Sequence, residues 1–141
     1  ELKNFFQRNK KAMPDFELLL TRNGENKGKS SFLVFKNNKY QTVLTENIAM
    51  FAIEEDIVYL YTFDRKRYPV FKNMEYIANV CDPHVFFRIN RQMLINRNTI
   101  LTIQPYFNRK VILELTIKPE NQIIVSRLKV TAFKEWLESG R

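Results

Sequence analysis

The sequence predicts a mainly β domain with a few short α-helices. From residue 31 onward, short runs of β-branched and aromatic residues alternate with polar turns, a pattern typical of strands. Leu113 to Ile117 alternates apolar and polar residues, as expected for a strand with one buried and one solvated face. Of the 141 residues, 45% are hydrophobic and 13% aromatic, which is enough to form a sizeable core.

The N-terminal part differs in character from the rest. Residues 2–13 can form a short helix that ends at Pro14. Residues 23–31 are polar, contain glycine and show no periodicity, so they indicate a linker. We therefore expect an N-terminal helix and linker over 1–30 and a folded domain over 31–141. Because the chain begins with Glu1 and not Met, we also expect it to be a fragment of a longer protein.

In the first half of the domain, the sequence predicts strands joined by tight turns. Asn37 and Asn38 tolerate the positive φ that a hairpin turn needs, and the carboxylates of residues 54–56 turn the chain further on. Asn73 can cap a short helix that runs through Cys81. The expected strands are 32–35, 40–44, 48–53, 57–63 and 68–71.

The last third predicts three more strands and a final helix. Asn108 and Arg109 form one turn, and residues 118–121 form another. The helix is expected over 128–138, because Val130, Phe133, Trp136 and Leu137 have helical spacing. The expected strands are 99–103, 110–117 and 122–125.

The positive charge is concentrated near the C-terminus. The chain has 23 basic and 15 acidic side chains, a net charge of +8. Between Phe86 and Lys134, nine Lys or Arg stand against two Glu, which accounts for seven of those eight charges. A basic stretch of this kind is typical of a domain that binds a polyanion, although solubility charge explains it equally well.

Catalysis, metal binding and membrane insertion find little support. The one histidine, His84, follows Pro83 and has no nucleophile pattern beside it, and no glycine-rich phosphate loop is present. One Cys, one His and scattered carboxylates lack the spacing of metal ligands. Apolar runs are only a few residues long. We expect no enzyme activity, no cofactor, no metal and no membrane segment. The lone Cys81 fits a reducing cytoplasm.

One segment, FFRINRQMLINRNTI over residues 86–100, combines apolar anchors with three arginines. Arginine's planar fork can pair with guanine or grip a phosphate. Arg127 lies just before the final helix and adds a second basic position. On residue chemistry alone, DNA or RNA binding is about as well supported as solvated strand faces or internal ion pairs. The aromatic residues lie within β runs, which argues against binding of single strands.

The same segment resembles the FFR-(I/V)-H/N-R-S/Q-x-(L/I)-V/I-N motif of LytTR-type DNA-binding domains. Residues 123–127, IIVSR, look like their terminal VSR motif, and residues 133–137 resemble the closing helix of the Bacteroidetes branch. Strand-like residues 32–34, 47–51 and 67–70 also fit the family, so the resemblance covers about 31–138. It implies small stacked β-sheets with short helices and a C-terminal helix.

The resemblance also implies roles for individual residues. Arg91 and Arg127 fall on base-reading positions, and Asn90 replaces a commoner histidine, as a base contact that also supports Arg91. The implied phosphate contacts are Arg88, Gln92, Arg97 and Lys129, and the implied structural supports are Asn96 and Ser126. The acidic turn 54–56 departs from the family pattern. It either stays off the DNA or has one carboxylate that accepts from cytosine N4.

The implied function is sequence-specific double-stranded DNA binding by the output domain of a bacterial two-component response regulator. Such domains place loops into successive major grooves of promoter DNA, bend it and control transcription. The resemblance further implies a cytoplasmic protein with an N-terminal receiver domain and an upstream sensor histidine kinase, and it allows a dimer on DNA. The alternative is a β-rich protein-interaction module whose basic stretch docks an acidic partner.

Overall fold

Ten strands in three antiparallel sheets form the frame of residues 28–139, the part of the chain that the computed structural model describes. The expected helix over 2–13 lies outside the described residues. The strands are β1 Ser31–Lys36, β2 Lys39–Leu44, β3 Ile48–Glu54, β4 Ile57–Thr62, β5 Arg67–Val70, β6 Phe86–Asn90, β7 Met93–Asn96, β8 Ile100–Tyr106, β9 Lys110–Leu115 and β10 Ile123–Val125. The α-helices are α3 Met74–Val80 and α4 Val130–Glu138, and 3₁₀ turns cover Thr45–Asn47, Arg97–Thr99 and Arg127–Lys129.

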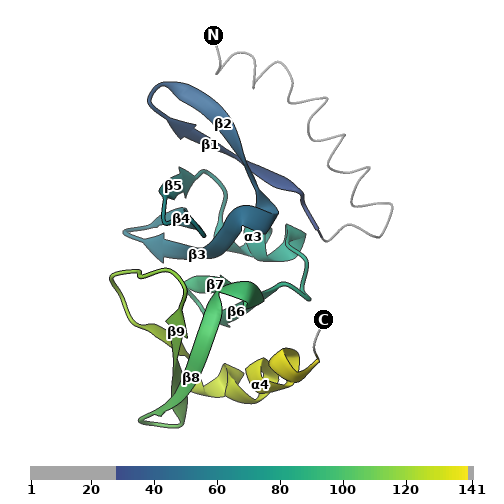
Figure 1. Cartoon of the computed structure of the whole chain (residues 1–141), viewed down its shortest axis with the longest axis vertical. Helices are drawn as coiled ribbons and strands as arrows, with labels where there is room; N and C mark the ends of the chain where they lie inside the picture. The colour runs from purple at the N-terminus through teal and green to yellow at the C-terminus, as the bar shows by residue number, and fades with distance from the viewer. Residues whose placement is uncertain (1–27, 140–141) are drawn as a thin grey trace.

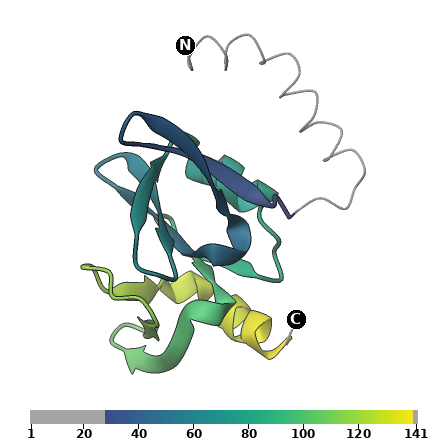
Figure 2. The ribbon, with the colours of Figure 1, turned by 45° about the horizontal axis from the view of Figure 1, so that its top comes forward.

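The three sheets are stacked one above the other. Figure 1 shows the β1–β2 hairpin at the top, the β3–β4–β5 region with α3 in the middle, and β8, β9 and α4 at the bottom. The middle sheet has the order β5-β4-β3-β7-β6, and the third sheet has the order β10-β9-β8. The tilted view of Figure 2 shows α4 beside β8 and β9, away from the hairpin. The prediction of a mainly β domain with small stacked sheets and a C-terminal helix is confirmed.

Two hydrophobic cores lie on opposite faces of the middle sheet. Phe51 of β3 belongs to the core shared with the β1–β2 hairpin and α3, while Met50 and Ala52 belong to the core shared with β8–β10 and α4. A bulge between Ile48 and Met50 shifts the alternation, so that Ala49 also faces the second core. Burial on both faces explains why β3 is a continuous apolar run with no polar alternation.

Several local predictions are confirmed in detail. Asn37 and Asn38 form the β1–β2 turn with φ of 55° and 64°. The β3–β4 turn is also left-handed, at Glu55 and Asp56. The side chain of Asn73 accepts a 2.8 Å hydrogen bond from the Tyr76 amide and caps α3 as expected.

Other boundaries differ from the predicted ones. Residues 86–98, to which the sequence assigned no secondary structure, form the β6–β7 hairpin and most of a 3₁₀ turn that ends at Thr99. β8 continues to Tyr106 and not 103, because an edge strand tolerates Pro105, which has no amide hydrogen to donate. The final α-helix begins at Val130 and not 128, because 127–129 is a 3₁₀ turn. No helix of the described part is long and apolar enough to cross a bilayer.

Candidate nucleic-acid interface

An open groove of about 1220 Å³ lies where the β6–β7 turn meets the segment between β10 and α4. Residues 90–93 and residues 126–129 line it and are called its two walls below, and residues of the β8–β9 and β9–β10 turns line it as well. The cationic side chains that line it are Arg88, Arg91, Lys110, Arg127 and Lys129, against the carboxylates of Asp56 and Glu75. The balance of charge favours an anionic ligand.

Two hydrogen bonds hold the two walls together. Asn90 Nδ2 donates to the Ile124 carbonyl at 2.7 Å, and the Ser126 amide donates to the Ile89 carbonyl at 3.0 Å. Both bonds join β6 to β10, which are in different sheets. The sequence motifs 86–100 and 123–127 are therefore brought to one groove by the Asn90 side chain and one backbone hydrogen bond, and not by the side chains of Arg91 and Arg127.

Four cationic side chains of the groove remain available for a ligand. Arg91 is exposed at the tip of the β6–β7 turn, Arg127 and Lys129 are exposed on the other wall, and Lys110 is half-buried at the start of β9. Within residues 28–139, none of these four side chains has a hydrogen bond or an ion pair. Gln92 is exposed beside Arg91, and its backbone carbonyl accepts from the Ile53 amide at 2.9 Å. The groove thus presents free donors from both walls.

Asn90 is engaged within the fold at both ends of its amide. In addition to the Nδ2 bond to Ile124, its Oδ1 accepts from the Gln92 amide at 2.8 Å. An amide with both ends occupied supports the turn and has little capacity left for a base. Its role as a base contact stays a prediction, while its support of the Arg91 turn is what the contacts describe.

Arg88 and Arg97, both expected at phosphates, also make internal bonds. Arg88 Nη2 donates to the Arg91 carbonyl at 2.6 Å, and Nη1 lies 3.6 Å from Glu75 Oε2. Arg97 donates to the His84 and Trp136 carbonyls, each at 2.9 Å. Arg97 is not among the residues that line the groove in the described chain. A phosphate contact by either residue stays a prediction. The internal bonds argue against it, because they already occupy donors of both guanidinium groups.

Asn96 and Ser126 both support the fold, Asn96 through its side chain and Ser126 through its backbone. The side chain of Asn96 is 1% exposed and donates to the Ile48 carbonyl at 2.9 Å, while its Oδ1 accepts from the Asn98 amide. It therefore links β7 to the start of β3. Ser126 supports the second wall through its backbone, whose carbonyl accepts from the Lys129 amide at 2.9 Å.

Two of the three carboxylates in the acidic turn 54–56 have distinct surroundings: Glu54 is bonded within the fold, and Asp56 lines the groove. Glu54 ends β3 and forms a 2.6 Å ion pair with Arg67, and it also accepts from the Tyr61 hydroxyl. Burial, and then the Glu54 carboxylate, raise the pKa of Tyr61 to about 12. Asp56 is among the residues that line the groove. Its carboxylate makes its own surroundings unfavourable for a phosphate.

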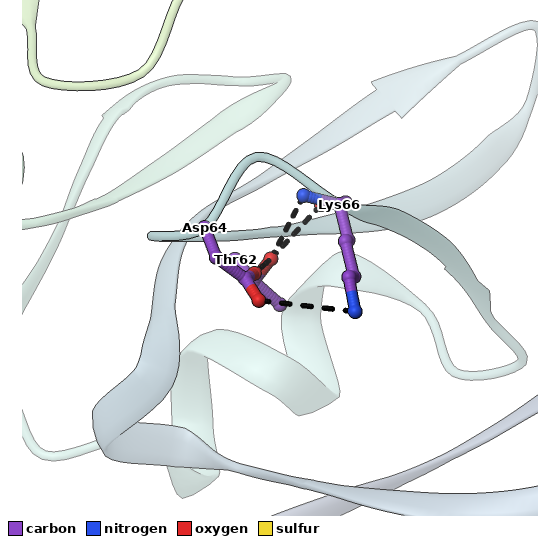
Figure 3. Close-up of polar contacts among 3 residues, drawn as sticks. All are labelled: Thr62, Asp64 and Lys66. Atoms are coloured by element: carbon purple, nitrogen blue, oxygen red, sulfur yellow. Dashed lines mark hydrogen bonds and ion pairs between the residues drawn. The ribbon is translucent and has the colours of Figure 1, made fainter.

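The basic residues 65–67, which lead into β5, are not among the described residues that line the groove. Figure 3 shows how it closes on itself: the Lys66 amide donates to Thr62 Oγ1 at 2.9 Å, Thr62 Oγ1 donates to Asp64, and Lys66 Nζ lies 3.9 Å from Asp64. Arg65 donates to the Thr116 carbonyl, and the guanidinium of Arg67 is held by Glu54. These cations therefore make contacts within the fold.

Polar residues that the sequence did not single out also line the groove. They are Glu75, Asn108, Lys110, Asn121 and Gln122. The Tyr106 hydroxyl donates to Gln122 Oε1 at 3.1 Å, which orients that amide. Their one signal in the sequence is that most of them fall in or beside predicted turns. The spatial convergence of three different turns could not be read from spacing.

Other candidate chemistry is not supported by geometry in the described part of the chain. No three His, Cys, Asp or Glu side chains of residues 28–139 gather in a way that could hold a metal ion. His84 is exposed, and its amide donates to Asp82 Oδ1. Cys81 is 1% exposed, and burial raises the pKa of its thiol to about 12, so the reactive thiolate is disfavoured.

The fold and the groove define a class of small β-rich domain that presents cationic turns around an open groove. The family model for the LytTr DNA-binding domain matches residues 38–138. The chain belongs to the LytTR family of DNA-binding domains. The matched region includes every strand and helix that borders the groove.

Solved and curated relatives agree with this assignment. The LytTr DNA-binding domain of a putative methyl-accepting/DNA response regulator from Bacillus cereus has the same fold, with a TM-score of 0.68 at 16% identity over 78% of this chain and 98% of that one. The transcriptional regulatory protein YpdB of Escherichia coli K12 is 33% identical over 81 residues, which are 57% of this chain and 32% of that protein. YpdB of Shigella flexneri gives the same values. The match thus spans about a third of the length of these curated relatives.

Proposed function

We propose that this domain binds double-stranded promoter DNA in a sequence-specific way and serves as the output domain of a transcriptional regulator. The observation that carries the proposal is the placement of Arg91 and Arg127. Their guanidinium groups come from two segments 36 residues apart, face one groove, and are free of hydrogen bonds and ion pairs within residues 28–139. A free guanidinium fork is the group best suited to guanine O6 and N7.

The groove supports a division of roles among its side chains. Arg91 and Arg127 read base edges, and each good bidentate contact is worth about 1–3 kcal/mol of discrimination. Lys129 and Gln92 stand beside them at the rims and contact phosphates, which fixes the register on the duplex. Asp56 lines the same groove and disfavours the phosphate backbone in its own surroundings, which restricts the orientation of the duplex.

The wider context is also part of the proposal. We place this domain after a receiver domain in a cytoplasmic two-component response regulator that a sensor histidine kinase controls. The support is the regulatory function in the names of its relatives, together with the small share of their length that it matches. The C-terminal residues 133–137 support a Bacteroidetes-like branch of the family. A dimer on DNA is compatible with this arrangement.

The experiment is selection of duplexes from a random-sequence pool, followed by titration of the selected site with salt. We expect one motif to be enriched and the binding constant to fall with salt, with a slope of about −0.9 for each phosphate contact. Weak binding that shows no enrichment over random duplex would overturn sequence specificity. Absence of duplex binding, together with saturable binding of an acidic protein, would instead support a protein-interaction module.

A further inference from the structure

The turn that carries Arg91 has an unusual backbone for a two-residue hairpin. The β1–β2 and β3–β4 hairpins have two-residue turns, and both central residues of each turn have positive φ. Asn90 pairs with Met93, so the β6–β7 turn also has two central residues, Arg91 and Gln92. Neither of them is among the described non-glycine residues with positive φ. Two-residue turns with negative φ match the twist of the flanking strands poorly, so this turn needs support from elsewhere.

Side chains from the end of β6 provide that support. Asn90 Oδ1 accepts from the Gln92 amide at 2.8 Å, which forms a local side-chain turn. Arg88 Nη2 donates to the Arg91 carbonyl at 2.6 Å. A hydrogen bond from a cationic donor is stronger than one between neutral groups, and this one holds the peptide of the reading residue itself. The register of β6 and β7 also shifts between Arg88 and Asn90, so that these two residues pair with the adjacent residues Leu94 and Met93 of β7.

Arg88 is in turn held from the opposite side. Its Nη1 lies 3.6 Å from Glu75 Oε2 of α3, while its Nε is buried without a hydrogen-bond partner among the described residues. The side chain of Arg88 is only 25% exposed, whereas that of Glu75 is 75% exposed. The guanidinium therefore lies between α3 and the turn, with its outer nitrogens directed at Glu75 and at the Arg91 carbonyl.

We propose that Arg88 is a positioning residue that presets the Arg91 turn, with Glu75 holding its guanidinium, and that it is not a phosphate contact. This inference rests on the proposed function for its effect on DNA, but its structural half concerns the free domain. A preset turn presents the Arg91 fork without an ordering cost at the moment of binding. Arg88 then acts on DNA only through Arg91.

The first test uses the free domain and no DNA. Backbone ¹⁵N relaxation of Arg91 and Gln92 should give order parameters near ~0.85 in the parent and below ~0.6 in Arg88→Gln. Lys129→Gln removes another groove cation that makes no bond to this turn, so it serves as the matched control and should leave both values unchanged. The amide spectrum outside the turn reports whether Arg88→Gln is folded. A turn that is already mobile in the parent, or equally rigid in Arg88→Gln, would overturn the inference whether or not the domain binds DNA.

The second test is a double-mutant cycle on a selected duplex. Arg88→Gln should weaken binding ~5-fold alone, yet by less than ~2-fold in an Arg91→Ala background, because its effect passes through Arg91. Lys129→Gln should cost the same factor in both backgrounds. An equal loss from Arg88→Gln in both backgrounds, with a salt slope smaller by about one unit, identifies a phosphate contact and refutes the positioning role. If the parent binds no duplex, the proposed function fails, while the relaxation experiment still decides whether Arg88 orders the turn.

Discussion

Replacement of Arg97 tests whether this arginine stabilises the fold or contacts DNA. Its Nε donates to the His84 carbonyl and its Nη2 to the Trp136 carbonyl, each at 2.9 Å, while Nη1 reaches the Leu137 carbonyl at 3.4 Å. Its Cζ also lies 4.1 Å from the centre of the Trp136 ring. One side chain thus joins the loop before β6 to the C-terminal end of α4, where the helix dipole favours a cation.

The magnitude follows from these contacts. Two well-formed charge-assisted hydrogen bonds and the stacked ring would give about 2–4 kcal/mol, after allowance for the partial exposure of the guanidinium. Carbonyls at the exposed end of the helix regain water when Arg97 is removed, which favours the lower end of that range. For a domain of this size, the loss corresponds to a decrease in Tm of about 8 °C or more.

The assay is urea unfolding of Arg97→Ala, with Arg109→Ala as the matched control. Arg109 is exposed and makes no bond within residues 28–139, so its removal should change the free energy of unfolding by less than about 0.5 kcal/mol. Arg97→Lys keeps the charge but loses the fork, and should fall between the two. The reasoning is refuted if Arg97→Ala unfolds like the control and instead lowers both the affinity for duplex and the salt slope.

Three further predictions concern the cores and the titrating groups. Phe133→Ala should lower the free energy of unfolding by about 3–5 kcal/mol, because the ring is 0% exposed and packs 5.5 Å from Phe87, and a loss below 1 kcal/mol in urea unfolding would contradict this. Asn96→Ala should cost about 1–3 kcal/mol by leaving the buried Ile48 carbonyl without its donor, and thermal unfolding would show it as a clear decrease in Tm. Cys81 and Tyr61 have pKa values raised to about 12 from 9.0 and 10.0, so stability should be full below pH 9 and fall as the pH rises towards 12. A urea midpoint that stays constant between pH ~8 and ~11 would count against that pH dependence.

Much of the fold could be predicted because its turns carry their own signals. Asn37 and Asn38 accept positive φ, and Asn73 caps α3, so these positions are decided by local chemistry. The β6–β7 hairpin was harder, because Arg91 and Gln92 are not residues that favour a hairpin turn. The turn is bonded by the side chains of Arg88 and Asn90, and Arg88 pairs with Glu75 of α3, a contact that leaves no pattern in the local sequence.

The site was predictable in its motifs but not in the use of each arginine. Arg91 and Arg127 reach the groove, whereas Arg97, six residues from Arg91 and chemically identical, caps α4. The difference arises from the packing of α4 against β6, which places the Trp136 and Leu137 carbonyls within reach of Arg97. The acidic turn 54–56 could not be divided into a structural Glu54 and a groove-lining Asp56 without the partners of Glu54.

The central claim is that Arg91 and Arg127 read sequence from one groove. The most direct measurement is the ratio of affinities for the selected duplex and a scrambled duplex, at fixed salt, for the parent, Arg91→Ala and Arg127→Ala. We expect each variant to lose ~5- to ~150-fold of that ratio, equivalent to about 1–3 kcal/mol, while its affinity for scrambled duplex changes much less. Base reading by Arg91 and Arg127 is contradicted if both variants keep the affinity ratio of the parent, or if they weaken binding to both duplexes equally.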